Sequence, residues 1–98
     1  MSRSYVYILK CSDGTYYTGS TKYLSRRLKQ HAAGEGSWYT RIRLPVKLVY
    51  YEEYDRIDHA FRREKQIQGW RQEKKIALIK GMKGKLPNLS KKRIRVKG

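Results

Sequence analysis

The sequence predicts an α+β domain in which a small, mainly antiparallel three-stranded sheet is flanked by helices, in the order β-β-α-β-α-α. Two stretches rich in tyrosine, valine and threonine lie on either side of an Asp-Gly turn near the start, and a third lies near the middle. Three other segments space apolar residues three or four positions apart, and a glycine follows each of them. At 98 residues the chain has room for one core, so we expect one domain over residues 1–80 and a basic, flexible tail over residues 81–98.

A β-hairpin opens the chain. Residues 4–10 are predicted as its first strand and residues 15–18 as its second. The three residues 12–14 between them, Ser-Asp-Gly, suit a bulged loop whose glycine is left-handed. Because a loop with an odd number of residues places Tyr7 and Tyr17 on the same face, we expect the two phenols to lie side by side.

A helix is predicted from about residue 22 to residue 33. Thr21 can cap its start and Gly34 can end it, while Leu24 and Leu28 form its buried side. The sequence therefore places one amphipathic helix directly after the hairpin.

Arg27 and His31 border the buried side of this helix. They are four residues apart, so they lie one turn above each other and point toward the same neighbour. The default for such side chains is to extend into solvent. A shared site therefore depends on what other residues lie nearby.

A polar segment at residues 34–43 is predicted as a loop, and a third strand follows at residues 46–54. Side chains along a strand alternate between its two faces. We expect one face to carry Val46, Leu48 and Tyr50, and the other to carry Val49 and Tyr51.

Two helices complete the predicted domain. Asp58 is the expected N-cap of the first, which runs to about Gln68 and presents Ala60, Phe61 and Ile67 as its apolar side. The second is predicted over residues 71–80, where it buries Ile76 and Ile79.

The chain carries 24 lysine and arginine residues against 8 aspartate and glutamate residues, a net charge of +16. So large a charge exceeds what solubility needs and opposes compaction, which indicates an anionic partner. Membrane binding needs an amphipathic helix with a broad apolar face or a lipidation signal, and the sequence shows neither. We therefore expect a cytoplasmic protein, assumed monomeric, that binds nucleic acid and uses no small-molecule cofactor.

Glu64 is the residue for which structural and functional interpretations differ most. It lies between Phe61 and Ile67 on the expected apolar side of its helix, where a carboxylate must reach water or meet a cation. An ion pair with Arg27 or another basic residue would be structural. The alternative is a divalent metal, because Mg²⁺ often takes one or two carboxylates and fills its remaining positions with water and phosphate oxygens.

Five residues could together hydrolyse a phosphodiester bond. The reaction needs a positioned water, a group that takes its proton, and positive charge where the phosphoryl group gathers negative charge. Tyrosine is a poor base because its free pKa is about 10, but a nearby guanidinium or metal lowers that pKa. The candidates are Tyr7, Tyr17, Arg27, His31 and Glu64.

Aromatic and basic side chains interleave in the segment 34–43, a mixture suited to stacking on unpaired bases beside phosphate contacts. Packing into the core is the competing interpretation of each aromatic residue. The candidate nucleic-acid-binding residues are Trp38, Tyr39, Arg41 and Arg43, with Lys22, Arg26 and Arg63 as further basic candidates.

Four motifs along residues 4–80 resemble those of the GIY-YIG nuclease domain. They are Tyr5-Val6-Tyr7 on a strand, Tyr17-Thr18-Gly19 after a turn, Ser25-Arg26-Arg27-Leu28 with His31 on a helix, and Arg63-Glu64-Lys65. The resemblance implies that Tyr7 and Tyr17 are the tyrosines of the two triplets. It also implies that Arg27 is the helix arginine, His31 its neighbour one turn later, and Glu64 the metal ligand.

The resemblance further implies hydrolysis with one divalent metal, Mg²⁺ or Mn²⁺, held by Glu64. A tyrosine with His31 would then help to deprotonate the attacking water, and Arg27 would stabilise the transition state. The implied function is a structure-selective or weakly specific DNA endonuclease in DNA repair or processing, whose products carry 5′-phosphate and 3′-hydroxyl ends.

Several members of that family carry an asparagine some dozen residues beyond the glutamate. Here that stretch, around Ile76, holds no amide. Either another group does this job, or the chain is a catalytically silent module that binds DNA or structured RNA. A small structural protein of a ribonucleoprotein is the third alternative.

Overall fold

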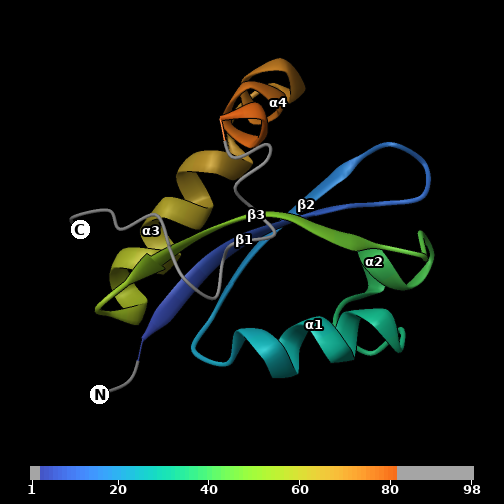
Figure 1. Cartoon of the computed structure of the whole chain (residues 1–98), viewed down its shortest axis with the longest axis horizontal. Helices are drawn as coiled ribbons and strands as arrows, with labels where there is room; N and C mark the ends of the chain where they lie inside the picture. Colours follow the sequence, from blue (N-terminus) through green and yellow to red (C-terminus); the bar gives the residue numbers. More distant parts are fainter. Residues whose placement is uncertain (1–2, 82–98) are drawn as a thin grey trace.

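The computed structural model describes residues 3–81, and its elements follow the predicted order with one short helix added (Figure 1). The elements are β1 (Ser4–Lys10), β2 (Tyr16–Thr21), α1 (Leu24–Ala32), α2 (Trp38–Arg41), β3 (Lys47–Tyr54), α3 (Ile57–Gln68) and α4 (Gln72–Lys80). The predicted tail, apart from Gly81, lies outside the described residues. No helix in residues 3–81 combines the length and apolar character needed to cross a membrane.

The three strands form one antiparallel sheet in the order β2-β1-β3, which confirms the predicted sheet. The loop predicted at residues 12–14 is present, and Gly14 has the expected positive φ, 85°. This loop sets a register in which Tyr7 lies opposite Gly19, with Tyr17 on the same face of the sheet.

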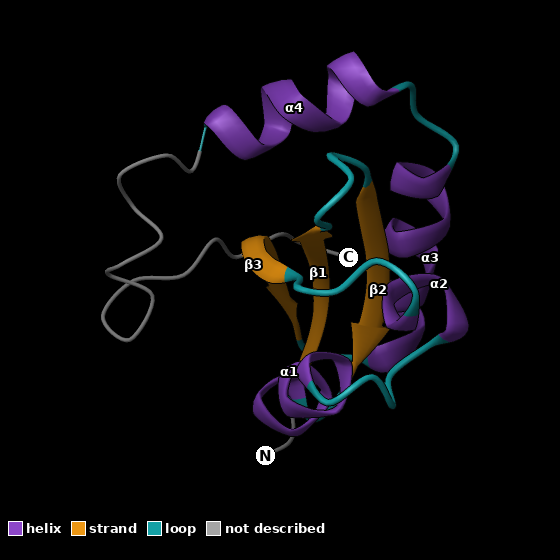
Figure 2. Ribbon diagram, turned by 90° about the vertical axis from the view of Figure 1, so that its right-hand side faces the viewer, coloured by secondary structure: helices purple, strands orange, loops and turns teal. Residues whose placement is uncertain are grey.

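Each face of the sheet has its own helices. On the α1 face, Leu24 and Leu28 pack against the sheet, and on the α3 face Ala60 and Ile67 do so together with Ile79 of α4. Figure 1 shows α1 and α2 below the strands and α3 and α4 above them. In Figure 2, α4 crosses beyond the ends of the strands. Both faces of the sheet are therefore covered.

The faces predicted for β3 are wrong because the strand contains a bulge. β1 pairs Ile8 with Tyr50 but Leu9 with Leu48, so Val49 is the extra residue. The alternation breaks at this point. Leu48 consequently packs on the α1 face, whereas Tyr50 packs on the α3 face.

Two predicted helix caps are also wrong. Tyr23 occupies the N-cap of α1, because Thr21 is still the last residue of β2. The Thr21 hydroxyl instead accepts a hydrogen bond from the N–H of Tyr23 at 3.0 Å, just before the helix. Arg56 occupies the N-cap of α3, so Asp58 falls in the first turn, where a negative charge favours the helix dipole.

Phe61 does not belong to the apolar side of α3, because its side chain is 50% exposed. The helix turns Ala60 and Ile67 toward the sheet, and one residue along a helix is a rotation of about 100°. Phe61 therefore faces outward, with the amine of Lys65 4.9 Å from its ring centroid.

The short helix α2 lies within the segment predicted as a loop. The Ser37 hydroxyl caps it by accepting a hydrogen bond from the N–H of Thr40 at 3.2 Å. A single turn of helix is too short to show apolar periodicity, so the sequence did not predict it.

Candidate active site

Tyr7 lies at the centre of the candidate active site. It is fully buried on β1, and its ring extends over Gly19 of the edge strand β2. A Cβ at residue 19 would lie 2.5 Å from the Tyr7 hydroxyl, so only glycine leaves room for the ring. The Tyr17 ring lies on the same face, with its centroid 6.4 Å from that of Tyr7. The predicted pairing of the two phenols is therefore confirmed.

His31 links Tyr7 to the short helix α2. It is fully buried, and its Nε2 lies 2.8 Å from the Tyr7 hydroxyl while its Nδ1 lies 2.8 Å from the Thr40 hydroxyl. Gly36 makes room for the imidazole, since a Cβ at that residue would lie 2.3 Å from Nδ1. The Tyr17 ring completes the enclosure, 5.2 Å from the imidazole between centroids.

The hydrogen bonds of Thr40 are compatible with a proton on Nδ1 of His31. When the Thr40 hydroxyl donates to the carbonyl oxygen of Ser37 at 3.3 Å, it accepts from the Nδ1–H of His31 at 2.8 Å. Nε2 then carries the lone pair and accepts from the Tyr7 hydroxyl. This orientation provides a path for a proton from Tyr7 to His31.

Burial raises the pKa of Tyr7 above its ordinary value of 10, and the neighbouring Tyr17 raises it further. Arg27 lowers the pKa, but its effect is smaller than that of burial. Arg27 therefore acts in the expected direction, but burial outweighs it, and in the metal-free chain the pKa of Tyr7 lies above its ordinary value. Tyr7 can accept a proton only as it passes its own to His31.

The pKa of His31 is lowered from its ordinary 6.5 by burial and, to a smaller extent, by Arg27. His31 therefore binds a proton more readily in the unfolded chain than in the folded one. The free energy of unfolding that neutral His31 contributes is fully present above pH 6.5, and it declines as the pH falls below that value. We expect the urea midpoint to fall as the pH is lowered through 6.5, above the range in which carboxylates titrate. His31→Gln should remove this slope, and an unchanged slope would contradict its assignment to His31.

Arg27 and Glu64 bring opposite charges to the cluster from helices on the two faces of the sheet. Arg27, half-buried on α1, lies near enough for its charge to lower the pKa of both Tyr7 and His31. Glu64, half-buried on α3, lies near enough to raise that of Tyr7. Because Glu64 accepts a hydrogen bond from Ser20 of the edge strand, it approaches the cluster at the outer side of β2.

The carboxylate of Glu64 is held by two neutral groups. Ser20 donates to one oxygen, and the Gln68 amide donates to the other at 2.8 Å. The same amide nitrogen donates to the carbonyl of Thr18 at 3.1 Å and so ties α3 to β2. Glu64 is therefore held by these neutral groups, whereas the structural interpretation of the sequence expected an ion pair with Arg27 or another basic residue.

The atoms around Glu64 suit a hard divalent ion. Its carboxylate and the Ser20 hydroxyl both offer oxygen, the donor that Mg²⁺ prefers. Within residues 3–81, no three His, Cys, Asp or Glu side chains gather into a metal-binding group. One carboxylate completed by water and substrate oxygens is an arrangement that Mg²⁺ accepts.

Arg63, a predicted nucleic-acid contact, lies away from this cluster in a buried ion pair on the α3 face. Its Nε and Nη2 each donate to Glu52 at 2.9 Å, and the hydroxyls of Tyr50 and Tyr54 donate to the same carboxylate. The guanidinium also lies 5.0 Å from the ring centroid of Trp70. This placement argues for a structural role and against the predicted contact with nucleic acid.

The other predicted nucleic-acid contacts divide into packed and exposed residues. Tyr39 stacks on Tyr17 with centroids 6.0 Å apart, and the Arg43 guanidinium lies 3.7 Å from the Tyr39 centroid. Arg43 also pairs with an aspartate of the hairpin loop at 3.0 Å. These two therefore extend the cluster as packing groups. The exposed members are Trp38, Arg41, Lys22 and Arg26.

The sequence did not predict three residues that hold the site, Ser20, Thr40 and Gln68. Gln68 follows Glu64 by four residues on one helix, a spacing that could have revealed it. Ser20 and Thr40 give no such signal, since their contacts depend on the register of β2 and on the position of α2.

Comparisons with known proteins identify one matching family model, similar chains and a similar solved structure. A family model described as the GIY-YIG catalytic domain matches residues 3–77. UPF0213 proteins of Staphylococcus aureus strains Mu3 and USA300 are each 45% identical over 80 residues, covering 82% of this chain and 98% of the relative. The solution NMR structure of the UPF0213 protein BH0048 from Bacillus halodurans aligns with a TM-score of 0.53 at 41% identity. That alignment covers 80% of this chain and 83% of the other.

Proposed function

The chain belongs to the GIY-YIG family of nucleases, and we propose that it is a metal-dependent endonuclease that hydrolyses phosphodiester bonds in DNA. The observation that carries this proposal is the meeting of Glu64 and Arg27 with the Tyr7–His31 pair at the edge of β2. We propose that it is structure-selective or weakly specific, and that it serves DNA repair or processing.

We assign the proton transfer to Tyr7 and His31. His31 is neutral, and its Nε2 accepts from the phenol, so Tyr7 can take a proton from the attacking water while it gives its own to His31. The Nδ1–H bond to Thr40 keeps the imidazole in the orientation that this transfer needs. Tyr17 packs over the imidazole and limits its exposure to solvent.

Arg27 and Glu64 deal with charge. The guanidinium of Arg27 would stabilise the negative charge that gathers on the phosphoryl oxygens in the transition state. Glu64, with Ser20 and Gln68 fixing its carboxylate, would hold Mg²⁺ or Mn²⁺. Such an ion, when bound, polarises the phosphoryl group and favours formation of the attacking hydroxide.

The test is a cleavage assay on the full chain with branched, single-stranded and duplex DNA and with RNA, in Mg²⁺, in Mn²⁺ and in EDTA. We expect cleavage that depends on the metal and leaves 5′-phosphate ends, which ligation to a 3′-hydroxyl strand would detect. Binding without cleavage on every substrate would contradict the proposal.

Replacing each phenol alone separates the roles of the two tyrosines. Tyr7→Phe should lower kcat by about 10²–10⁴-fold, because it removes the group that exchanges protons with both water and His31. Tyr17→Phe keeps the ring that packs on His31, so its effect should be smaller. Single-turnover rates measure both, and a larger loss in Tyr17→Phe would transfer the role of base to Tyr17.

A catalytically silent nucleic-acid-binding module is the second candidate function. One observation favours it: Tyr7 and His31 are fully buried, so only Tyr17, Arg27 and Glu64 of the cluster reach solvent. For this module, affinity for nucleic acid should be the same with and without divalent metal, and Glu64→Gln should leave it unchanged.

A further inference from the structure

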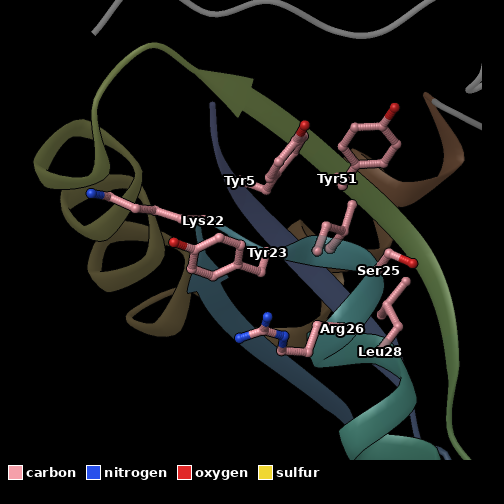
Figure 3. Close-up of a pocket in the computed structure, with 8 residues that line it drawn as sticks. Tyr5, Lys22, Tyr23, Ser25, Arg26, Leu28 and Tyr51 are labelled. Carbon is pink, nitrogen blue, oxygen red and sulfur yellow. The ribbon is translucent and has the colours of Figure 1, made fainter. Parts of the chain in front are cut away.

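A hollow of about 580 Å³ lies between the start of α1 and the sheet (Figure 3). None of the five candidate catalytic residues lines it; these are Tyr7, Tyr17, Arg27, His31 and Glu64. Tyr5 of β1 and Tyr51 of β3 lie on the sheet side, while Tyr23 and Leu28 lie on the side of α1 (Figure 3). Its described lining also includes Lys22 and Arg26, and it includes no acidic residue. The hollow therefore combines apolar rings with positive charge.

Tyr23 is the most unusual part of this lining. Its side chain is 60% exposed, although a large aromatic residue gains most stability when buried. The Arg26 guanidinium lies over this ring, 5.0 Å from its centroid, and both side chains are exposed to solvent. Tyr5 and Tyr51, packed edge to face at 5.9 Å, are by contrast held by the core.

We propose that this hollow binds an unpaired nucleotide, whose base stacks on Tyr23 while its phosphate lies against Lys22 and Arg26. Stacking on an aromatic side chain needs an exposed base face, which an unpaired nucleotide offers and a base pair inside a duplex does not. A lining with two cations and no acid, on a chain of net charge +16, favours a polyanion over a protein partner. A pocket of this volume lies in the range that accommodates small organic ligands.

The position of the hollow connects it to the candidate active site. Arg26 and Arg27 are consecutive on α1, with Arg26 lining the hollow and Arg27 acting on Tyr7 and His31. Both places therefore use side chains of α1. The inference rests on the proposed function, because it takes the ligand to be nucleic acid. It also gives a physical reason why the nuclease would prefer branched or single-stranded substrates.

The test measures binding of the full chain in EDTA to fluorescent dT12, rU12 and a blunt DNA duplex. We expect Tyr23→Ala to weaken binding of a single strand at least about fivefold and to leave duplex binding within about twofold, whereas Tyr23→Phe retains single-strand affinity. A loss on dT12 alone, rU12 alone or both supports the site and shows which sugar it accepts. Because Tyr23 is exposed, these variants should keep the fold.

Phe61→Ala is the matched control. It removes another exposed ring that has a cation beside it, Lys65 at 4.9 Å, but it lies on α3. An equal loss in Phe61→Ala, an equal loss on single strand and duplex, or no loss in Tyr23→Ala would each overturn the inference.

The same assay with Glu64→Gln separates this inference from the proposed function. Tyr23-dependent binding should persist in that background whether or not the chain cuts DNA. Absence of cleavage would therefore contradict only the proposed nuclease activity. Loss of the effect of Tyr23→Ala on binding would contradict only the proposed nucleotide site.

Discussion

Glu64→Gln should abolish metal-dependent cleavage, lowering kcat by at least about 10²–10³-fold, while leaving affinity for DNA within about twofold. The glutamine keeps the size of the side chain and can still bond to Ser20 and Gln68, so the fold and the edge of β2 stay in place. What it loses is the negative charge that would hold Mg²⁺ or Mn²⁺. Losing one group that acts on the transition state through charge typically costs this much.

Single-turnover cleavage and metal-free binding of the same labelled substrate measure the two effects. Glu73→Gln is the matched control, because it makes the same chemical change at an exposed position in the first turn of α4. Equal loss in both variants would show that overall charge matters. Full activity in Glu64→Gln would remove Glu64 from the mechanism.

Arg63→Met should destabilise the protein by about 3–5 kcal/mol, the typical cost of removing one partner of a buried ion pair. The Glu52 side chain is 1% exposed, and Arg63 supplies its only cation among the described ion pairs. Without Arg63 the two tyrosine hydroxyls remain, but they do not balance the charge. Since a domain is typically stable by about 5–15 kcal/mol, the urea midpoint should fall far.

Two further variants separate this effect from a loss of nucleic-acid contact. Adding Glu52→Gln to Arg63→Met should recover part of the stability, because it removes the unpaired charge. Arg56→Ala breaks the exposed pair with Asp58 and should leave the midpoint unchanged. If folded Arg63→Met instead keeps full stability and loses DNA binding, the residue is a nucleic-acid contact after all.

The surroundings of Glu52 and Glu64 show why the sequence alone could not tell which glutamate belongs to the candidate active site. Both combine a glutamate with tyrosines and an arginine brought together by β-strands and helices. Around Glu52 the network is closed, since Arg63 satisfies both oxygens and the neighbouring tyrosines are buried. Around Glu64 the partners are neutral and the side chain is half-exposed. Which glutamate stays exposed to solvent and without a cation partner in residues 3–81 depends on packing across the sheet.

The hairpin was predictable because its loop and register follow from local rules. The three-residue loop puts Tyr7 and Tyr17 on one face, and the spacing of Arg27 and His31 on one helix follows from the helical repeat. These residues therefore converge as expected. The bulge at Val49 and the single turn α2 are set by tertiary packing, so the sequence missed the faces of β3 and the bond between His31 and Thr40.

The protonation of Tyr7 was also beyond the sequence. A guanidinium nearby does lower its pKa, as chemistry predicts, but the sequence could not show that burial would outweigh this effect. This matters for the mechanism, because a neutral Tyr7 can take a proton only while it passes its own to His31.

Amide chemical shifts followed during a Mg²⁺ titration of the full chain, with Glu64→Gln in parallel, test most directly whether these groups form one metal-dependent centre. We predict that Glu64, Ser20, Tyr17 and Arg27 respond together with a single apparent Kd, and that Glu64→Gln abolishes the response. Shifts confined to other surfaces, or an unchanged response in Glu64→Gln, would contradict the account.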